Sequence, residues 1–160
     1  METPQVSFAG FWKRVVAAII DSLILGVVHF LLFVPLFGVL GIGAMAGADQ
    51  EFDSGASPGF ILAIVGTAMA GAAAVFVVGW LYYALMESSA KGGTLGKMAL
   101  GIKVTDLSGN RISFGRATGR YFGKIISAVI LYIGFIMAGF TQQKQALHDI
   151  IAGCLVVNKQ

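Results

Sequence analysis

The feature that most constrains this chain is a long apolar segment, Phe11 to Phe33, that carries an acid, Asp21, in its interior. In a helix that turns about 100° per residue, Arg14, Asp21 and His29 fall within a sector of about 80°. These three ionisable side chains therefore share one helix face. We expect that face to point away from lipid.

The depth of Asp21 in the membrane decides how it can be accommodated. The apolar residues from 15 to about 40 can cross a hydrocarbon core of about 30 Å, and Asp21 would lie roughly 10 Å below Arg14. An ionised aspartate there costs about 2.5 to 3.5 kcal/mol, so it must be paired, hydrated or protonated. One interpretation is a buried pair with Arg14, His29 or another base. The other is a place on an ion or proton path, which acids inside membranes often mark.

Composition indicates an integral membrane protein. Of its 160 residues, 57% are hydrophobic and only 12% are charged. We expect a single membrane domain over residues 1–160, with spans at about 12–39, 59–86 and 121–141. The third apolar segment is short for a full crossing, so it either re-enters the membrane or forms two short helices. The predicted fold class is an all-α integral membrane protein with three apolar segments and a small cytoplasmic β-hairpin.

Charge positions predict the topology. Trp12 precedes Lys13 and Arg14 at the start of the first span, a combination of aromatic and basic residues typical of a cytoplasmic interface. The loop 41–58 contains three acids and neither Lys nor Arg, whereas 87–124 contains seven basic residues against two acids. The positive-inside rule therefore places the N-terminus and a basic loop, residues 87–120, in the cytoplasm. We expect a multi-pass protein.

The basic loop contains structural signals of its own. Alternating residues around a Ser-Gly-Asn turn predict a β-hairpin from about Lys103 to Phe114. The sequence 154–157 also resembles a strand. Pairing of Leu155 to Val157 with the hairpin would return the C-terminus to the cytoplasm, and we expect that arrangement.

Basic side chains after the hairpin predict a contact with lipid. Arg116, Arg120 and Lys124 are spaced four apart and share one helix face, which we expect to rest on the anionic lipids of the inner leaflet. Lys97 or Arg120 could instead neutralise Asp21.

Four segments together resemble the RDD family of small bacterial membrane proteins: GFWKRVVAAIIDSLI, GGTLGKMALGIKVTDLSGN, RATGRYFGK and ALHDIIAGCLVV. The resemblance covers nearly the whole chain, and the family is named for one arginine and two aspartates. It implies that Arg14 and Asp21 are the arginine and the first aspartate. The second aspartate is best matched by Asp149, with Asp106 as the alternative. Cys154 stands where we expect a threonine in the family's closing segment.

The resemblance also implies a bacterial cytoplasmic membrane and a role in transport, since some family members have been linked to sodium/proton antiport. Our first hypothesis is a small homo-oligomeric transporter of cations or protons. Asp21 would bind the ion, Arg14 would tune its pKa, and His29 or Asp149 would act as a relay. Three spans hardly enclose a pathway alone, and small residues on the second span would supply the contact between copies: Gly66, Ala70 and Ala74.

The second hypothesis is a non-transporting membrane adaptor or scaffold. Arg14, Asp21 and Asp149 would form a buried structural network, with His148 as a further charge partner, and the basic loop would recruit a partner or anionic lipid. The sequence contains no recognisable catalytic constellation, so we expect neither enzyme activity nor a cofactor. The single cysteine excludes a multi-cysteine metal site, and we expect no metal. The basic residues follow the membrane sides, so we expect no nucleic-acid partner.

Overall fold

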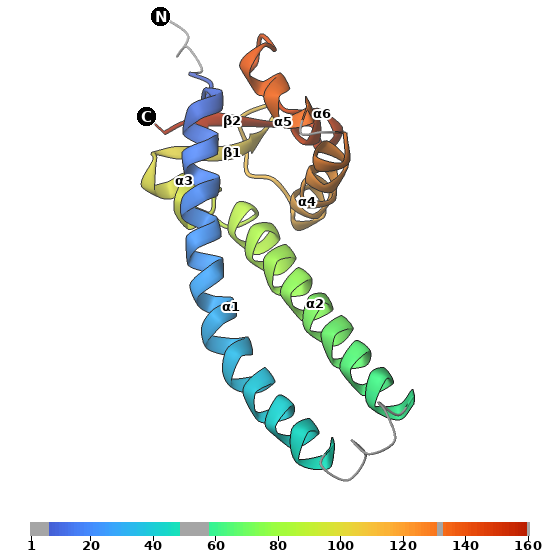
Figure 1. The fold of residues 1–160 in the computed structure, drawn as a ribbon. Helices are drawn as coiled ribbons and strands as arrows, with labels where there is room; N and C mark the ends of the chain where they lie inside the picture. Colours follow the sequence, from blue (N-terminus) through green and yellow to red (C-terminus); the bar gives the residue numbers. More distant parts are fainter. Residues whose placement is uncertain (1–6, 49–57, 131–132, 160) are drawn as a thin grey trace, which may run out of the picture. The chain divides into compact units, whose positions relative to one another are not determined.

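The structure is a computed structural model and describes residues 7–48, 58–130 and 133–159. Two long helices, α1 (Phe11–Ala48) and α2 (Pro58–Glu87), are followed by shorter elements (Figure 1). These are α3 (Leu95–Ala99), β1 (Ile102–Asp106), α4 (Phe114–Val129), α5 (Ile133–Ile136), the 3-10 helix η1 (Met137–Gly139), α6 (Leu147–Ala152) and β2 (Cys154–Asn158). The predicted fold class, an all-α membrane protein with a small β element, is confirmed, and the β element is an antiparallel sheet of two strands.

The chain forms two compact units. One contains Met1–Ser22 and Trp80–Gln160, and we call it the network unit. The other contains Leu23–Gly79, and we call it the helix-pair unit. Both α1 and α2 continue from one unit into the other.

The first two predicted spans correspond to helices that are long and apolar enough to cross a membrane. They run over Phe11–Pro35 and Ile61–Glu87, each with a mean hydropathy of 2.4. The helix α1 continues through Pro35 to Ala48, beyond the end predicted near residue 39. Its last turns are still apolar, and a helix is the conformation that satisfies their backbone groups without water. The predicted acidic loop, with Asp49, Glu51 and Asp53, lies outside the described residues.

The third apolar segment is bent. The helical stretches Phe114–Val129 and Ile133–Gly139 meet at 117°, so this part of the chain forms short helices in place of one straight span. A bend of this size fits both predicted alternatives, a re-entrant segment and two short helices.

The sheet pairs two strands that lie far apart in the sequence. Strands β1 and β2 are antiparallel, with Lys103 opposite Val157 and Thr105 opposite Leu155. The predicted pairing of residues 155–157 with the strand in the basic loop is therefore confirmed. The second half of the predicted hairpin is wrong, because the chain turns after β1 and Ser113 instead caps the N-terminus of α4. Its hydroxyl accepts a hydrogen bond from the Arg116 N–H at 3.3 Å.

The two faces of this sheet have different environments. One face packs into the core of the network unit, together with small residues from both long helices and from α4. The buried core residues are Ala9, Ala17, Ala84, Ile102, Val104, Ile112, Ala117, Cys154 and Val156. The other face carries Lys103, Thr105, Leu155 and Val157. Residues 7–9 cover the free edge of β2, where the Ala9 N–H donates to the Val156 carbonyl at 2.9 Å.

The helix-pair unit exposes many apolar side chains, as expected of a surface that lipid covers. Within it the close approach between helices is at Gly71, where an added Cβ would collide with the ring of Phe37. Gly66, which belongs to the stripe predicted to contact another copy, lies elsewhere on α2: an added Cβ there would meet no atom within 4 Å of the described chain. His29 also lies in this unit, with its ring 5.8 Å from that of Phe33.

Candidate functional site

The buried charges of the network unit form two groups. The larger group, which we call the ion network, joins five helices through ion pairs between Arg14, Glu87, Lys97, Arg120, Lys124 and Asp149. The smaller group, which we call the Asp21 site, consists of Asp21 and its uncharged donors on Tyr82, Thr94 and Gly96.

Asp149 anchors one end of the ion network from the first turn of α6. Its Oδ2 accepts a hydrogen bond from the Ala146 N–H at 3.1 Å, which caps the helix. The same oxygen accepts from Nη1 of Arg14, and Oδ1 accepts from Nε of Arg120 at 2.7 Å. Asp149 is fully buried, so its charge is compensated by two guanidinium groups and by the helix end.

Glu87 anchors the other end of the ion network at the C-terminus of α2. Its Oε2 accepts from Nη1 of Arg120 at 3.0 Å, and its Oε1 accepts from Nζ of Lys97. Nζ of Lys124 lies 3.7 Å from Oε1 and 3.7 Å from the centre of the Tyr83 ring. Arg120, which is 2% exposed, bridges the two acids. A buried charge without compensation is expensive, and both acids here are compensated by direct contacts.

Asp21 is held differently. The Tyr82 hydroxyl donates to Oδ1 at 2.8 Å, the Thr94 hydroxyl donates to Oδ2 at 2.6 Å, and the Gly96 N–H donates to Oδ1 at 2.8 Å. Asp21 is 1% exposed, so this side chain is buried in protein. No Lys or Arg among the described residues forms an ion pair with it. Asp21 is therefore the buried acid whose contacts are all neutral.

Local sequence explains why the segment before β1 approaches Asp21. Thr94 caps α3, accepting from the Lys97 N–H at 3.4 Å, while its own hydroxyl donates to Asp21. Gly96 lets the backbone of α3 lie directly on α1. A Cβ at this position would collide with the carbonyl oxygen of Ala17 and lie 2.9 Å from Oδ1 of Asp21. The glycine and the threonine of this segment thus build the Asp21 site.

Burial and neighbouring charges together set the pKa values of Lys97 in α3 and of His148 and Asp149 in α6. Burial lowers the pKa of Lys97, although the charge of Glu87 opposes this. Burial alone would raise the pKa of Asp149, but the charges of Arg120 and Arg14 outweigh it and hold that pKa well below its ordinary value. Burial lowers the pKa of His148 to about 3. At neutral pH Asp149 is therefore ionised and His148 is neutral, with Nε2 of His148 3.4 Å from Oδ1 of Asp149.

The structure separates residues that the sequence analysis grouped around Asp21. Arg14 binds Asp149 and forms no ion pair with Asp21 in the described chain, so Arg14 is not the base that pairs with Asp21 under the first interpretation. Lys97 binds Glu87, and Arg120 binds Glu87 and Asp149, so neither neutralises Asp21 by contact. These three bases form their ion pairs with Glu87 and Asp149. Asp21 instead contacts the Tyr82 hydroxyl of α2 and the Thr94 hydroxyl at the start of α3.

Two other predicted site residues lie apart from both groups. His29 belongs to the helix-pair unit, where its Nε2 is buried without a hydrogen-bond partner in the described part of the chain. Asp106 stabilises the turn after β1, accepting from the Ser108 and Asn110 N–H groups at 2.9 and 2.8 Å. Of the two candidates for the second aspartate, Asp149 is therefore the one in the ion network.

The predicted basic face of α4 points inward. Arg120 and Lys124 reach Glu87, and only Arg116 is exposed, with its Nη1 3.9 Å from Asp106. The expectation that these three residues rest together on lipid is therefore wrong. Spacing defines a shared face, but it does not tell which side of the helix faces the protein.

Sequence reasoning missed Glu87, Tyr82, Thr94 and Gly96 as members of these groups, and it placed Lys124 on lipid. Glu87 ends a span that is otherwise uncharged and precedes the basic loop, and that position could have marked it as the acid that the basic residues need. The hydroxyls of Tyr82 and Thr94 offer no comparable signal. Within the described residues no three His, Cys, Asp or Glu side chains gather closely enough to hold a metal ion.

Comparison with known proteins places this arrangement in a family. The model of the RDD family matches residues 8–153. The chain is 39% identical to the uncharacterized protein YxaI of Bacillus subtilis (strain 168), over 99% of this chain and 100% of that protein. It is 31% identical to the uncharacterized membrane protein YteJ of the same organism, over 96% of this chain and 83% of YteJ.

A third relative matches over a shorter region. The uncharacterized protein RP437 of Rickettsia prowazekii (strain Madrid E) is 36% identical over 83 residues, which is 51% of this chain and 41% of that protein. No solved structure matches. The match to the family model over residues 8–153, with two relatives that align over nearly all of this chain, shows that this membrane protein belongs to the RDD family.

Proposed function

We propose that this RDD-family protein moves protons or small cations across the membrane, and that Asp21 is the group that binds them. The observation that supports this is the contrast between the buried acids. Glu87 and Asp149 are fixed by ion pairs, whereas Asp21 contacts only neutral donors. A carboxylate in a membrane-spanning helix without a paired base can gain or lose a positive charge, which ion-coupled transport requires.

The chemistry of the Asp21 site suits such an exchange. Tyr82 and Thr94 each place a hydroxyl oxygen within 2.8 Å of the carboxylate. A hydroxyl can donate to the ionised acid and, after rotation, offer its lone pairs to a cation. Carboxylate and hydroxyl oxygens are ligands that hard cations accept. The ion network would hold the surrounding helices in place during the exchange.

The proposal includes a topology and an assembly. The basic residues between 87 and 124 favour a cytoplasmic position for the network unit and for the N-terminus, in a bacterial cytoplasmic membrane. Two or three spans hardly enclose a path, so we expect the transporter to be a homo-oligomer.

The test is ion flux in proteoliposomes under imposed pH, sodium or potassium gradients. Wild-type flux should be lost in Asp21→Asn at matched insertion and retained in Arg116→Gln, which removes an exposed charge from α4. Tyr82→Phe keeps the carboxylate and removes one hydroxyl, so it should shift the cation concentration or pH at half-maximal flux. Undiminished flux in Asp21→Asn, or no flux from folded wild type, would disprove the proposal.

A second candidate is the non-transporting scaffold. The observation that favours it is that the three hydrogen bonds to Asp21 tie α1 to α2 and α3, while Arg120 bridges Glu87 and Asp149. In that case wild type passes no ion. Asp21→Asn would then lower stability and the recovery of a membrane partner or anionic lipid. The same liposome experiment, combined with an unfolding measurement, separates the two functions.

A further inference from the structure

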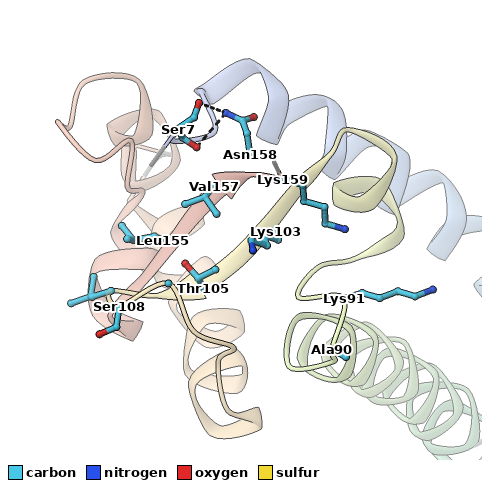
Figure 2. A pocket seen from close by; sticks show the side chains of 12 residues that line it. Ser7, Ala90, Lys91, Lys103, Thr105, Ser108, Leu155, Val157, Asn158 and Lys159 are labelled. Carbon is cyan, nitrogen blue, oxygen red and sulfur yellow. Dashed lines mark hydrogen bonds between the residues drawn. The ribbon is translucent and has the colours of Figure 1, made fainter. Parts of the chain in front are cut away.

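A pocket of about 750 Å³ lies over the outer face of the two-stranded sheet, and it shares no lining residue with the ion network or the Asp21 site (Figure 2). Strand residues form much of the wall, and it is lined by lysines from β1, from the position after β2 and from the loop after α2. The lining residues used below are Lys91, Lys103, Thr105, Leu155, Val157 and Lys159. A volume of this size is typical of sites for small organic molecules.

Strand register brings two lysines together in this pocket. Lys103 is opposite Val157, and Lys159 follows two residues after Val157. The ladder extends this far, because the Lys159 N–H donates to the Gly101 carbonyl at 2.7 Å. Lys103 and Lys159 are therefore diagonal neighbours on one face, with a Cα spacing of about 7–8 Å. That separation lets two ammonium groups converge on one anion.

The positive charge in this pocket is not compensated by the described protein. Lys91, Lys103 and Lys159 form neither an ion pair nor a side-chain hydrogen bond with any residue that the structure describes. The described lining contains no acid. By contrast, Lys97 and Lys124 both reach Glu87. Like charges on one strand pair repel, and an anion between them would relieve that repulsion.

Thr105 supplies an independent sign of a missing ligand. It is 3% exposed, and its Oγ1 is buried without a hydrogen-bond partner in the described chain. It shares the face of Lys103, two residues further along β1. A buried hydroxyl without a partner is costly, and an acceptor entering the pocket would remove that cost.

The pocket is also polarised along the strands. In Figure 2 the labelled lysines lie on one side of the sheet face, and Leu155 and Ser108 lie on the other. Leu107 and Leu155 are apolar lining residues at the end away from Lys159. An anion alone would occupy a small part of this space. The geometry favours an anionic group attached to a larger, partly apolar body.

We propose that this pocket binds a phosphate-bearing organic molecule, with the phosphate group between Lys103 and Lys159. The Thr105 hydroxyl would donate a hydrogen bond to the phosphate. The apolar end of the pocket would contact the remainder of the molecule. A phosphate has several acceptor oxygens, which match two ammonium groups and a hydroxyl. The phosphate could come from a phospholipid headgroup or from a water-soluble ester. Both sources share this chemistry, and the experiment distinguishes them.

The experiment uses the full chain in maltoside detergent and phosphate-free buffer. Two probes are compared: glycerol 3-phosphate, followed by calorimetry, and phosphatidylglycerol in mixed micelles, followed by native mass spectrometry. Binding of the soluble ester assigns the site to soluble esters, and binding of the lipid alone assigns it to headgroups. Lys103→Gln with Lys159→Gln should weaken binding about tenfold per ammonium group removed. Lys144→Gln, which removes a charge outside the pocket, should bind as wild type does.

A second variant tests the hydroxyl. Thr105→Val keeps the side-chain shape and loses no hydrogen bond of the described protein, so its unfolding midpoint should not fall. Its affinity for the bound probe should drop several-fold. Unchanged affinity in Thr105→Val would overturn the placement of the phosphate beside Thr105. Equal binding by the double lysine variant and Lys144→Gln, or no binding of either probe to wild type, would overturn the site.

Discussion

Buried carboxylates in this protein are stabilised in two chemically distinct ways. Asp149 and Glu87 each contact two or more cations, so removing one base leaves a buried charge that is poorly compensated. Asp21 instead receives three hydrogen bonds from neutral groups, and these stabilise the ionised form without fixing a counter-charge beside it. This difference between residues of the same kind is the basis of the proposed function.

Gly96→Ala tests whether the Asp21 site depends on a close approach of backbones. The added Cβ would collide with the Ala17 carbonyl and crowd Oδ1 of Asp21, so α3 must move away from α1. We expect a loss of about 1–3 kcal/mol in the free energy of unfolding, the usual cost of overpacking. Denaturant titration in detergent measures it. Gly119→Ala is the matched control: nothing in the described structure lies within 4 Å of its added Cβ, and it should be neutral or slightly stabilising. Equal stabilities for the two variants would contradict the packing described.

Helix α4 carries two arginines one turn apart with opposite environments, and this gives a prediction for that element. Arg120 is buried between Glu87 and Asp149, whereas the Arg116 side chain is 52% exposed. Arg120→Ala should lower the free energy of unfolding by about 3–5 kcal/mol, because two buried acids lose a partner. Arg116→Ala should change it by about 0–1 kcal/mol, as for other exposed pairs. Similar losses for both variants would show that α4 is not oriented as described.

Some of these features could be predicted from the sequence, and others, such as the orientation of α4, could not. The long apolar helices and both strands were predictable, since hydrophobic length and strand-like composition are local signals. The partner of β1 depended on a long-range pairing, and the Ser113 cap competed with the second half of a hairpin. The inward direction of Arg120 depended on Glu87, which lies 33 residues earlier. The Ser113 cap is a local contact with Arg116 that competes with an equally local strand pattern. The direction of Arg120 was decided by a residue far away in the sequence, and no local pattern encodes that contact.

At the scale of the whole molecule, the network unit is held together by contacts between segments near the two ends of the chain. Residues 7–9 pair with β2, β2 pairs with β1, and α6 presents Asp149 to Arg14 at the start of α1. The charged groups that hold this unit together come from segments that only folding brings close. Stability of the whole should therefore respond to any change that alters the charge near Asp149.

Lowering the pH should reduce this stability through His148, because folding keeps its imidazole neutral. Its imidazole is buried beside Asp149, and burial lowers its pKa to about 3 from an ordinary 6.5. Below pH 6.5 the unfolded chain binds a proton that the folded protein does not, so lowering the pH destabilises the fold. The charges of Arg120 and Lys124 add to this effect, and those of Asp149 and Glu87 oppose it. Asp149, whose pKa is lowered on folding, adds a further loss of stability below about pH 4.

Replacing the imidazole should remove the first part of this loss. Relative to wild type, His148→Gln should gain up to about 2 kcal/mol of unfolding free energy between pH 8 and pH 5, since each pH unit is worth about 1.4 kcal/mol. Denaturant titration of both proteins at the two pH values measures this difference, and the pH 8 values correct for packing against Phe135, whose ring centre is 5.1 Å from the imidazole. The remaining acid sensitivity, from Asp149, should appear only at lower pH and persist in the variant. An unchanged difference between pH 8 and pH 5 would mean that His148 is protonated in the folded protein, and the charge balance around Asp149 would then include a third cation.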